Sequence, residues 1–296
     1  MAYSLQPSVQ GTASVADLVS YCREHVRYGD HESILAASDM LAAVANDRGL
    51  LVRAINTTLL GRDDHFNNSM GVSSQAVLLY SDATYKIRAN VWKKPVVRAG
   101  SLAHDSSLYS YNYAHNHNFE LLTIGYLGSG YWTEIHECNP REIQGYIGED
   151  VTLKFLEKTS LPRGKVMLYR ACDDVHTQLP CEELSVSLNL IVGAPQGQLP
   201  DQYAFDVSNS RISGLITSND TGTVSLLSFA ALLGATEAFD SIERIAVGTG
   251  HWRLRMEAFK VACHLAPGER SRLWRRAEGD DEPMISQAAR RWLAHG

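Results

Sequence analysis

The chain has 296 residues, of which 45% are hydrophobic and 20% are charged, and its net charge is −6. This balance is typical of a folded globular protein and excludes disordered and fibrous classes. The acidic excess argues against a nucleic-acid partner, and no window approaches the ~18 apolar residues of a membrane span, so we expect a small-molecule or peptide-like substrate.

The first segment, residues 1–70, is predicted to be helical. Between Val15 and Leu60, apolar side chains recur at spacings of three and four residues, which is the pattern of one buried helix face. Ser14 stands just before the first of these runs. It is a candidate N-cap, because its hydroxyl can accept a hydrogen bond from a free N–H of the first turn.

The middle segment, residues 71–218, is predicted to consist of β-strands. Residues 75–94 alternate around a turn at Ser81–Asp82, which indicates a β-hairpin. From Leu108 to about Ile216, short apolar runs are separated by Gly, Pro, Asn and Asp, and no helical pattern stands out. A succession of short strands favours a sandwich or a barrel. The runs are SLYSYNYAHNH, ELLTIGYL, YWTEIHE, DVTLKFLE, KVMLYRA, LSVSLNLIV and RISGLIT.

Helical periodicity returns in the last segment, residues 223–296. Residues 255–259 and 285–289 lie 30 positions apart, and each opens an amphipathic helix. This weak repetition resembles short HEAT-like helical repeats. The helical segments are therefore candidates for a homodimer surface or for a surface that binds a protein partner.

The clearest chemical signal is the pair of histidines at positions 115 and 117. Side chains two residues apart on a strand point to the same face, so His115 and His117 would present two imidazoles on one side. Two such rings can bind one metal ion with bonds of ~2.0–2.1 Å. His176, from a neighbouring strand, would complete a facial set of three and leave positions open for substrate and oxidant.

This spacing resembles the first motif of the cupin superfamily, which reads His-x-His, three or four residues, Glu, six residues, Gly. His115, His117 and Gly128 fit it, but Leu121 stands where the family has its glutamate ligand. Glu120 is one position out of register. A local bulge that turned its carboxylate inward would make Glu120 an alternative metal ligand.

A later stretch resembles the second cupin motif. Residues 161–168 contain its proline and glycine followed by an apolar strand, and His176 takes the place of its histidine. The resemblance covers residues 75 to about 216, roughly half of the chain. It implies an α+β fold: a cupin barrel (a double-stranded β-helix, or jelly roll) with the metal site at residues 71–218, flanked by the N- and C-terminal helical segments.

The histidine set resembles that of three-histidine cupin dioxygenases, such as those acting on thiols and diketones. The resemblance implies a non-haem Fe(II) oxygenase that uses O2 on an anionic small molecule, amino acid or peptide-like substrate, with Mn, Ni, Cu or Zn as alternative metals. Because no carboxylate belongs to the set, a 2-oxoglutarate enzyme is not favoured. Two other classes stay open: a redox-neutral isomerase or lyase, and a non-enzymatic ligand-binding or scaffold protein.

Further residues are candidates for roles around the metal. Tyr113 shares the predicted face of the histidines, as a catalytic group or as a core tyrosine, and Gln178 could bind substrate or orient an imidazole. Arg88 resembles, by its place on an early strand, the carboxylate-binding arginine of thiol dioxygenases, although an exposed strand arginine is the more common case. Ser187 and Asn189 belong to a polar stripe that faces either a wet cavity, as substrate-binding residues, or bulk water.

The cysteines bear on the compartment. There are five, at positions 22, 138, 172, 181 and 263, and none has CxxC spacing. An odd number without paired spacing favours reduced thiols, and the N-terminus has no basic, then apolar, secretory pattern. We therefore expect a cytoplasmic protein.

Overall fold

The computed structural model describes residues 3–59, 75–95, 109–195, 200–218 and 220–295. It divides into two compact units, residues 1–217 and 218–296. The boundary that we expect between residues 70 and 71 lies outside the described residues. The division of the chain into three segments therefore stays a prediction.

The N-terminal segment is helical between Val15 and Leu59, as predicted, but Tyr3–Leu5 forms a strand, β1, that pairs with the larger sheet and that the helical pattern did not predict. The first helix, α1 (Val15–His25), begins after Ser14, whose hydroxyl accepts a hydrogen bond from the backbone N–H of Asp17. The Asp17 carboxylate in turn accepts from the Ser14 N–H at 2.9 Å, which completes a capping box and confirms Ser14 as the N-cap. Three more helices follow: α2 (His31–Ala36), α3 (Ser38–Asn46) and α4 (Leu50–Leu59).

The larger sheet has six antiparallel strands in the order β1-β7-β4-β9-β3-β2. The predicted hairpin is confirmed, since β2 pairs with β3 around the turn that begins at Ser81. In chain order the strands are β1 (Tyr3–Leu5), β2 (Ala76–Ser81), β3 (Tyr85–Trp92), β4 (Phe119–Leu127), β7 (Val166–Tyr169) and β9 (Ser185–Gly193).

The smaller sheet is ordered β6-β5-β8 and is extended on the β8 side by residues 109–118. Its strands are β5 (Trp132–Glu137), β6 (Lys154–Ser160) and β8 (Asp174–Leu179). His115 forms bridges to both His176 of β8 and Ala204 of a further hairpin. That hairpin consists of β10 (Gln202–Asp206) and β11 (Arg211–Thr217).

The continuous strand predicted across SLYSYNYAHNH is wrong for the part that the structure describes. Ser110 and Asn112 have φ values of 53° and 58°, in the left-handed region that interrupts an extended chain. The pairing of this segment is therefore limited to bridges at Tyr111 and His115. The polar strand β8 was not among the predicted runs, because DVHTQL lacks a clear alternation of apolar side chains.

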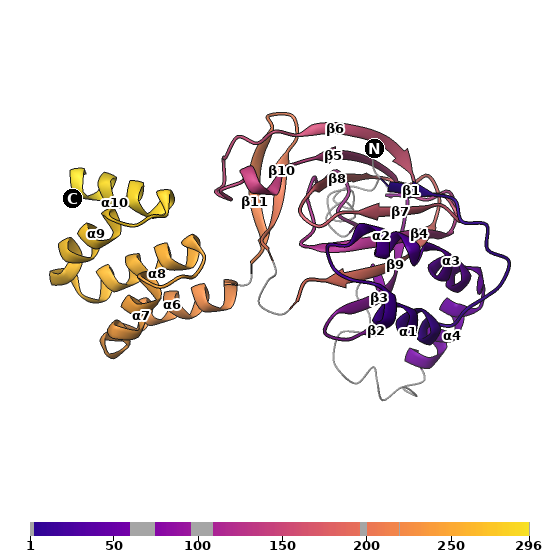
Figure 1. Ribbon diagram of the computed structural model, residues 1–296, viewed down its shortest axis with the longest axis horizontal. Helices are drawn as coiled ribbons and strands as arrows, with labels where there is room; N and C mark the ends of the chain where they lie inside the picture. The colour runs from indigo at the N-terminus through magenta and orange to yellow at the C-terminus, as the bar shows by residue number, and fades with distance from the viewer. Residues whose placement is uncertain (1–2, 60–74, 96–108, 196–199, 219, 296) are drawn as a thin grey trace. The chain divides into compact units, whose positions relative to one another are not determined.

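Strand order identifies the fold. Residues 109–118, β8, β5 and β6 face the larger-sheet strands β3, β9, β4 and β7, and the chain crosses from one set to the other repeatedly (Figure 1). This is the order of a double-sheet jelly roll, the double-stranded β-helix of cupins. The predicted α+β fold with a cupin barrel is confirmed.

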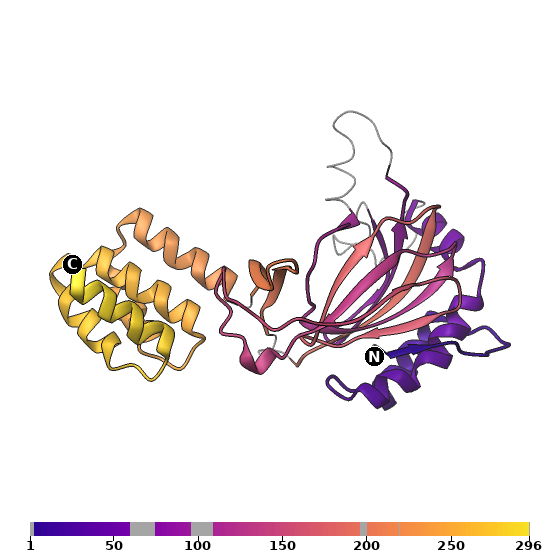
Figure 2. The same cartoon turned by 90° about the horizontal axis from the view of Figure 1, so that it is seen from above.

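Both faces of the larger sheet are covered. On β3, Ile87 and Ala89 belong to a core that they share with α1 and α3, and on β9 Leu188 and Leu190 do the same. Figure 2 shows these helices along one side of the barrel. Residues of opposite parity, such as Trp92, therefore face the barrel interior, where a second core contains the large side chains Tyr131, Tyr169, Leu121, Ile135 and Met167.

The second unit is helical, as predicted. Its helices are α6 (Thr221–Leu233), α7 (Phe239–Ala246), α8 (Trp252–Leu265), α9 (Arg270–Glu278) and α10 (Pro283–His295). Phe259, Leu273 and Ile285 lie in its core, one from each of the last three helices. The HEAT-like classification of these helices stays a prediction. Among the described residues, no helix is both long and apolar enough to cross a membrane.

Candidate metal centre

Three buried histidines meet inside the barrel. His115 and His176 lie opposite each other on neighbouring strands and exchange two backbone hydrogen bonds, of 3.0 and 2.9 Å. Their ring centroids are 4.4 Å apart, and those of His117 lie 4.7 Å from His176 and 5.0 Å from His115. One ring nitrogen from each residue lies within 4.8 Å of the other two. The sequence therefore identified a set that the fold brings together.

The ring contacts indicate which nitrogens are left for a metal. Nδ1 of His115 lies 2.8 Å from the carbonyl oxygen of Tyr113, to which a protonated Nδ1 donates. Nδ1 of His117 lies 3.4 Å from the side-chain amide nitrogen of Gln202. With Nδ1 of His115 protonated, Nε2 of that ring is the atom that can coordinate. In His117, Nε2 is free to coordinate when the Gln202 amide turns its oxygen, and not its nitrogen, toward Nδ1.

The surroundings of the His176 ring show whether these residues fit a metal ion. It is fully buried, and neither of its ring nitrogens has a hydrogen-bond partner among the described residues. A buried polar group without a partner is costly and is rare in folded proteins. A cation held jointly with His115 and His117 would satisfy one of these nitrogens, so the residues fit a metal ion.

Electrostatics keep the cluster in the form that binds metal. Burial lowers the pKa of His115, and it lowers the pKa values of His117 and His176 well below the ordinary value of 6.5. The neighbouring imidazoles further lower the pKa values of His117 and His176, and the charge of Arg88 also lowers that of His117. Neutral imidazole is the form that coordinates divalent metals, so the cluster is ready to bind at neutral pH.

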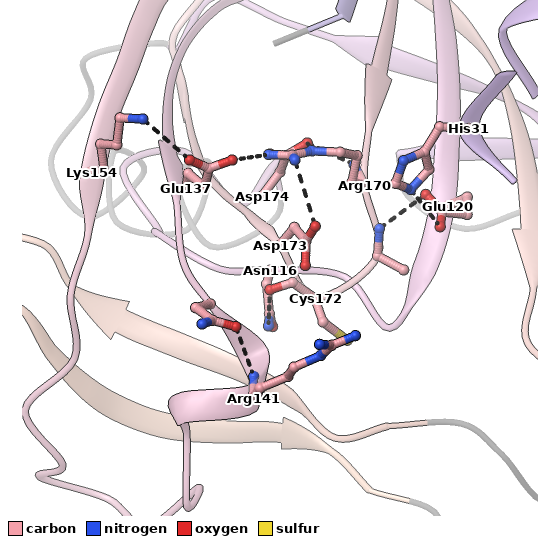
Figure 3. Close-up of polar contacts among 12 residues, drawn as sticks. His31, Asn116, Glu120, Glu137, Arg141, Lys154, Arg170, Cys172, Asp173 and Asp174 are labelled. Atoms are coloured by element: carbon pink, nitrogen blue, oxygen red, sulfur yellow. Dashed lines mark hydrogen bonds and ion pairs between the residues drawn. The ribbon is translucent and has the colours of Figure 1, made fainter. Parts of the chain in front are cut away.

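Glu120 does not join the histidines, which corrects its assignment as the alternative ligand. It shares a face of β4 with Leu122, toward the N-terminal helices and away from the barrel interior. Its carboxylate lies 3.3 Å from Nε2 of His31 on α2 and accepts a hydrogen bond from the backbone N–H of Ala171 (Figure 3). The bulge that would have turned Glu120 inward does not form, because β4 pairs in regular register with β9 from Phe119 to Gly125.

Arg88 points into the barrel. The alternative that it is an ordinary exposed arginine of a strand is therefore wrong. It alternates with Ile87 and Ala89, which face the helices, and its Nε atom is buried without a partner among the described residues. Burial lowers the pKa of its guanidinium, which stays protonated at neutral pH. Its charge acts on both His117 and Tyr131. The interior therefore holds a cation close to the histidines that has no carboxylate partner in the part of the chain that the structure describes.

The other predicted site residues differ in their surroundings. Ser187 and Asn189 line the interior, where the Ser187 hydroxyl accepts from Nε1 of Trp92 at 3.0 Å and the Asn189 side chain accepts from Thr123. The polar stripe thus faces inward and not bulk water.

Gln178 is buried on the same strand as His176, and its Oε1 has no partner among the described residues. Tyr113 stacks near His115 with ring centroids 5.7 Å apart and is 45% exposed, so it lies at the surface beside the cluster.

Several interior residues were missed by sequence reasoning. Tyr169 lies with its ring centroid 4.5 Å from that of His176, and its hydroxyl is 3.5 Å from that of Tyr131. Asn90 and Trp92 follow Arg88 at every second position of β3, which is the signal that would have found them. Gln202 carried no signal, because it lies far along the chain from the residue that it contacts.

A charged network lies at the end of the small sheet beside the cluster. The Arg170 guanidinium binds the buried carboxylate of Asp174 at 2.6 Å and the partly exposed carboxylate of Glu137 at 3.1 Å (Figure 3). These two acids, together with Asp173 at 3.5 Å, raise the pKa of Arg170. Because the carboxylates are already paired, this network holds the loop between β7 and β8 in place and supplies no further ligand to the histidines.

No protein-family model matches the sequence, and no curated protein matches it. Among solved structures it is similar to a DMSP lyase (14% identity, 43% of this chain, 50% of that chain, TM-score 0.26). It is also similar to salicylate 1,2-dioxygenase from Pseudoaminobacter salicylatoxidans, with 10% identity over 48% of this chain and 31% of that chain and a TM-score of 0.25. A third similar structure is a cupin-2 domain protein from Shewanella frigidimarina, with 10% identity over 47% of this chain and 99% of that chain and a TM-score of 0.22. The chain thus spans about half of the DMSP lyase. These values are too low to bear on function, and the fold assignment rests on strand order.

Proposed function

We propose that this protein is a non-haem, metal-dependent oxygenase in which His115, His117 and His176 hold Fe(II). The observation that carries the proposal is the buried imidazole of His176, both of whose nitrogens lack a partner among the described residues while two further imidazoles face it. Bound to three neutral ligands, Fe(II) would keep its full formal charge and offer open positions to an anionic substrate and to O2.

The residues around the cluster favour an anionic substrate. Arg88 forms no ion pair with any carboxylate that the structure describes, and its charge acts on His117. A substrate anion bound between Arg88 and the histidines would pair this cation and would be oriented by it. Amino acids, thiol acids and peptide-like carboxylates belong to this class.

Polar side chains on the barrel wall would set the orientation of the rest of the substrate. The Tyr131 and Tyr169 hydroxyls adjoin each other, and burial raises the pKa of Tyr131 to about 12, so it stays a hydrogen-bond donor at neutral pH. Gln178 offers an amide oxygen that has no partner among the described residues. Buried apolar side chains among these groups, such as Leu121, Ile135 and Met167, would lower the local dielectric constant and strengthen each polar contact.

The test measures metal and oxygen separately. The purified chain is loaded anaerobically with Fe(II), bound iron is measured, and O2 consumption is followed with thiols, amino acids, peptides and diketones. We expect a single iron per chain and O2 uptake that requires both iron and substrate. His117→Ala and His176→Ala should each lose most of the iron, whereas His136→Ala, a buried histidine outside the cluster, should retain it.

Other outcomes would replace the proposal. Tight binding of Zn, Ni or Mn with substrate turnover but no O2 uptake would indicate a redox-neutral isomerase or lyase. Absence of bound metal under every loading condition would leave a ligand-binding or scaffold protein.

A further inference from the structure

The β10–β11 hairpin lies outside the eight-strand barrel, yet it is joined to the segment that carries two of the histidines. The backbone N–H of Asn116 donates to the carbonyl of Tyr203 at 3.2 Å, and that of Phe205 donates to Ala114 at 2.9 Å. The Asn116 side chain also accepts from the N–H of Tyr203 at 2.8 Å. The hairpin is therefore bonded to the residues on both sides of His115.

This pairing brings one polar side chain of the hairpin to the cluster. Gln202, the first residue of β10, is 8% exposed, and its amide nitrogen lies 3.4 Å from Nδ1 of His117. This is the one hydrogen bond of the Gln202 side chain among the described residues. A buried amide is costly unless it is hydrogen-bonded, so its place beside His117 calls for a specific partner.

We propose that Gln202 is a positioning residue that holds His117 in the orientation and tautomer required for metal binding. The amide nitrogen that faces Nδ1 in this structure would donate to it and leave the imidazole proton on Nε2, where it blocks a metal. A half-turn of the amide brings its oxygen to Nδ1, and this costs no other hydrogen bond of the side chain among the described residues. The oxygen then accepts a hydrogen bond from a protonated Nδ1. With Nδ1 protonated, the lone pair of Nε2 is free for a metal. Tyr113 serves His115 in the same way through its carbonyl oxygen, at 2.8 Å. The inference rests on the proposed metal site and assigns the hairpin a part in building it.

The test uses Co(II), whose visible absorption reports ligand geometry, added to the metal-free full chain. Gln202→Met keeps the side-chain length but removes the amide, and we expect it to weaken Co(II) binding by about 10- to 100-fold and to shift the absorption bands. Gln202→Glu keeps an acceptor for the Nδ1 proton and should bind close to the unaltered chain. Thr217→Val is the control, because Thr217 is the exposed cross-strand neighbour of Gln202.

The outcomes are distinguishable. Metal-free Gln202→Met should unfold at the temperature of Thr217→Val, so that weaker binding reflects the position of His117 and not a loss of folding. Unchanged Co(II) affinity and an unchanged spectrum in Gln202→Met would overturn the inference. It would also be overturned if Gln202→Met bound Co(II) more weakly but unfolded at a lower temperature, and Gln202→Glu did not restore the affinity. If the unaltered chain bound no Co(II), the proposed metal site itself would be refuted.

Discussion

The carboxylate of Glu120 lies 3.3 Å from Nε2 of His31, so the acidic residue nearest to the cupin glutamate position joins the barrel to helix α2 (Figure 3). It is 2% exposed, and its second contact is the backbone N–H of Ala171 at 3.0 Å. Burial raises the pKa of Glu120, and both of these contacts oppose that rise by favouring the carboxylate. Glu120 is thus a structural residue in this chain.

Replacing Glu120 should separate stability from metal binding. Glu120→Ala leaves the partly buried N–H of Ala171 without its acceptor and breaks the pair with His31, so we expect a loss of about 1–3 kcal/mol in the free energy of unfolding. Iron stoichiometry should be unchanged, because the carboxylate faces away from the histidines. Denaturant unfolding and metal analysis of the same preparation measure both.

His31→Ala provides the partner variant for this prediction. If the two residues act as a pair, the double variant should lose less than the sum of the two single variants. A Glu120→Ala protein that lost its iron while His176→Ala kept it would show that the ligand set is wrong.

Arg88 should bind anions. An anion at about 100 times its dissociation constant stabilises a protein by about 2.7 kcal/mol, so small carboxylates should raise the unfolding temperature of the metal-free chain. Arg88→Met should lose this rise. Without anions the variant should be as stable as the unaltered chain or more so, because it lacks a desolvated charge that has no carboxylate partner among the described residues.

The matched control for the Arg88 experiment is Arg211→Met, an exposed arginine of β11 that pairs with Asp150 at the surface. It should retain the full effect of added carboxylates. An equal response in Arg88→Met would show that the anions bind elsewhere.

Acid should destabilise the protein partly through His136. Burial lowers the pKa of His136 below its ordinary value of 6.5. A histidine whose pKa is lower in the folded state stabilises the fold while it is neutral. This stabilisation is fully present above pH 6.5, the pKa of the unfolded chain, and is lost as the pH falls from there through the lower pKa of the folded state. The slope from one such group is at most about 1.4 kcal/mol per pH unit.

His136→Phe removes this group and fills a similar volume, so the metal-free variant should lose less stability on acidification than the unaltered chain. Urea unfolding at a series of pH values on both sides of 6.5 measures the difference. His264→Phe, at an exposed position of α8, should follow the unaltered chain. Parallel curves for all three proteins would exclude His136 as a source of the acid sensitivity.

Local patterns in the sequence predicted many of the secondary-structure elements of this protein and the three histidines of its candidate metal centre. The Ser14 cap, the hairpin around Ser81 and the C-terminal helices follow from nearest-neighbour periodicity and turn chemistry, which depend little on the rest of the chain. The spacing of His115 and His117, with His176 later, identified the set that the barrel brings together. These features could be predicted because each one is encoded within a few residues.

The side of each strand that faces the barrel was decided only by tertiary structure. On β9 the apolar residues Leu188 and Leu190 face the N-terminal helices, so the polar Ser187 and Asn189 point inward, the reverse of an ordinary two-layer sheet. The alternation alone cannot reveal this, because it fixes two faces without saying what covers each.

Long-range pairing decided the rest of the site. Glu120 turns away from the histidines because the register of β4 with β9 places it on the helix side. Gln202 reaches His117 from 85 residues further along the chain, through backbone bonds between β10 and residues 114–116. The sequence determined which groups could bind a metal, and the packing of sheets, helices and hairpin determined which of them meet, since contacts at such separations depend on the whole fold.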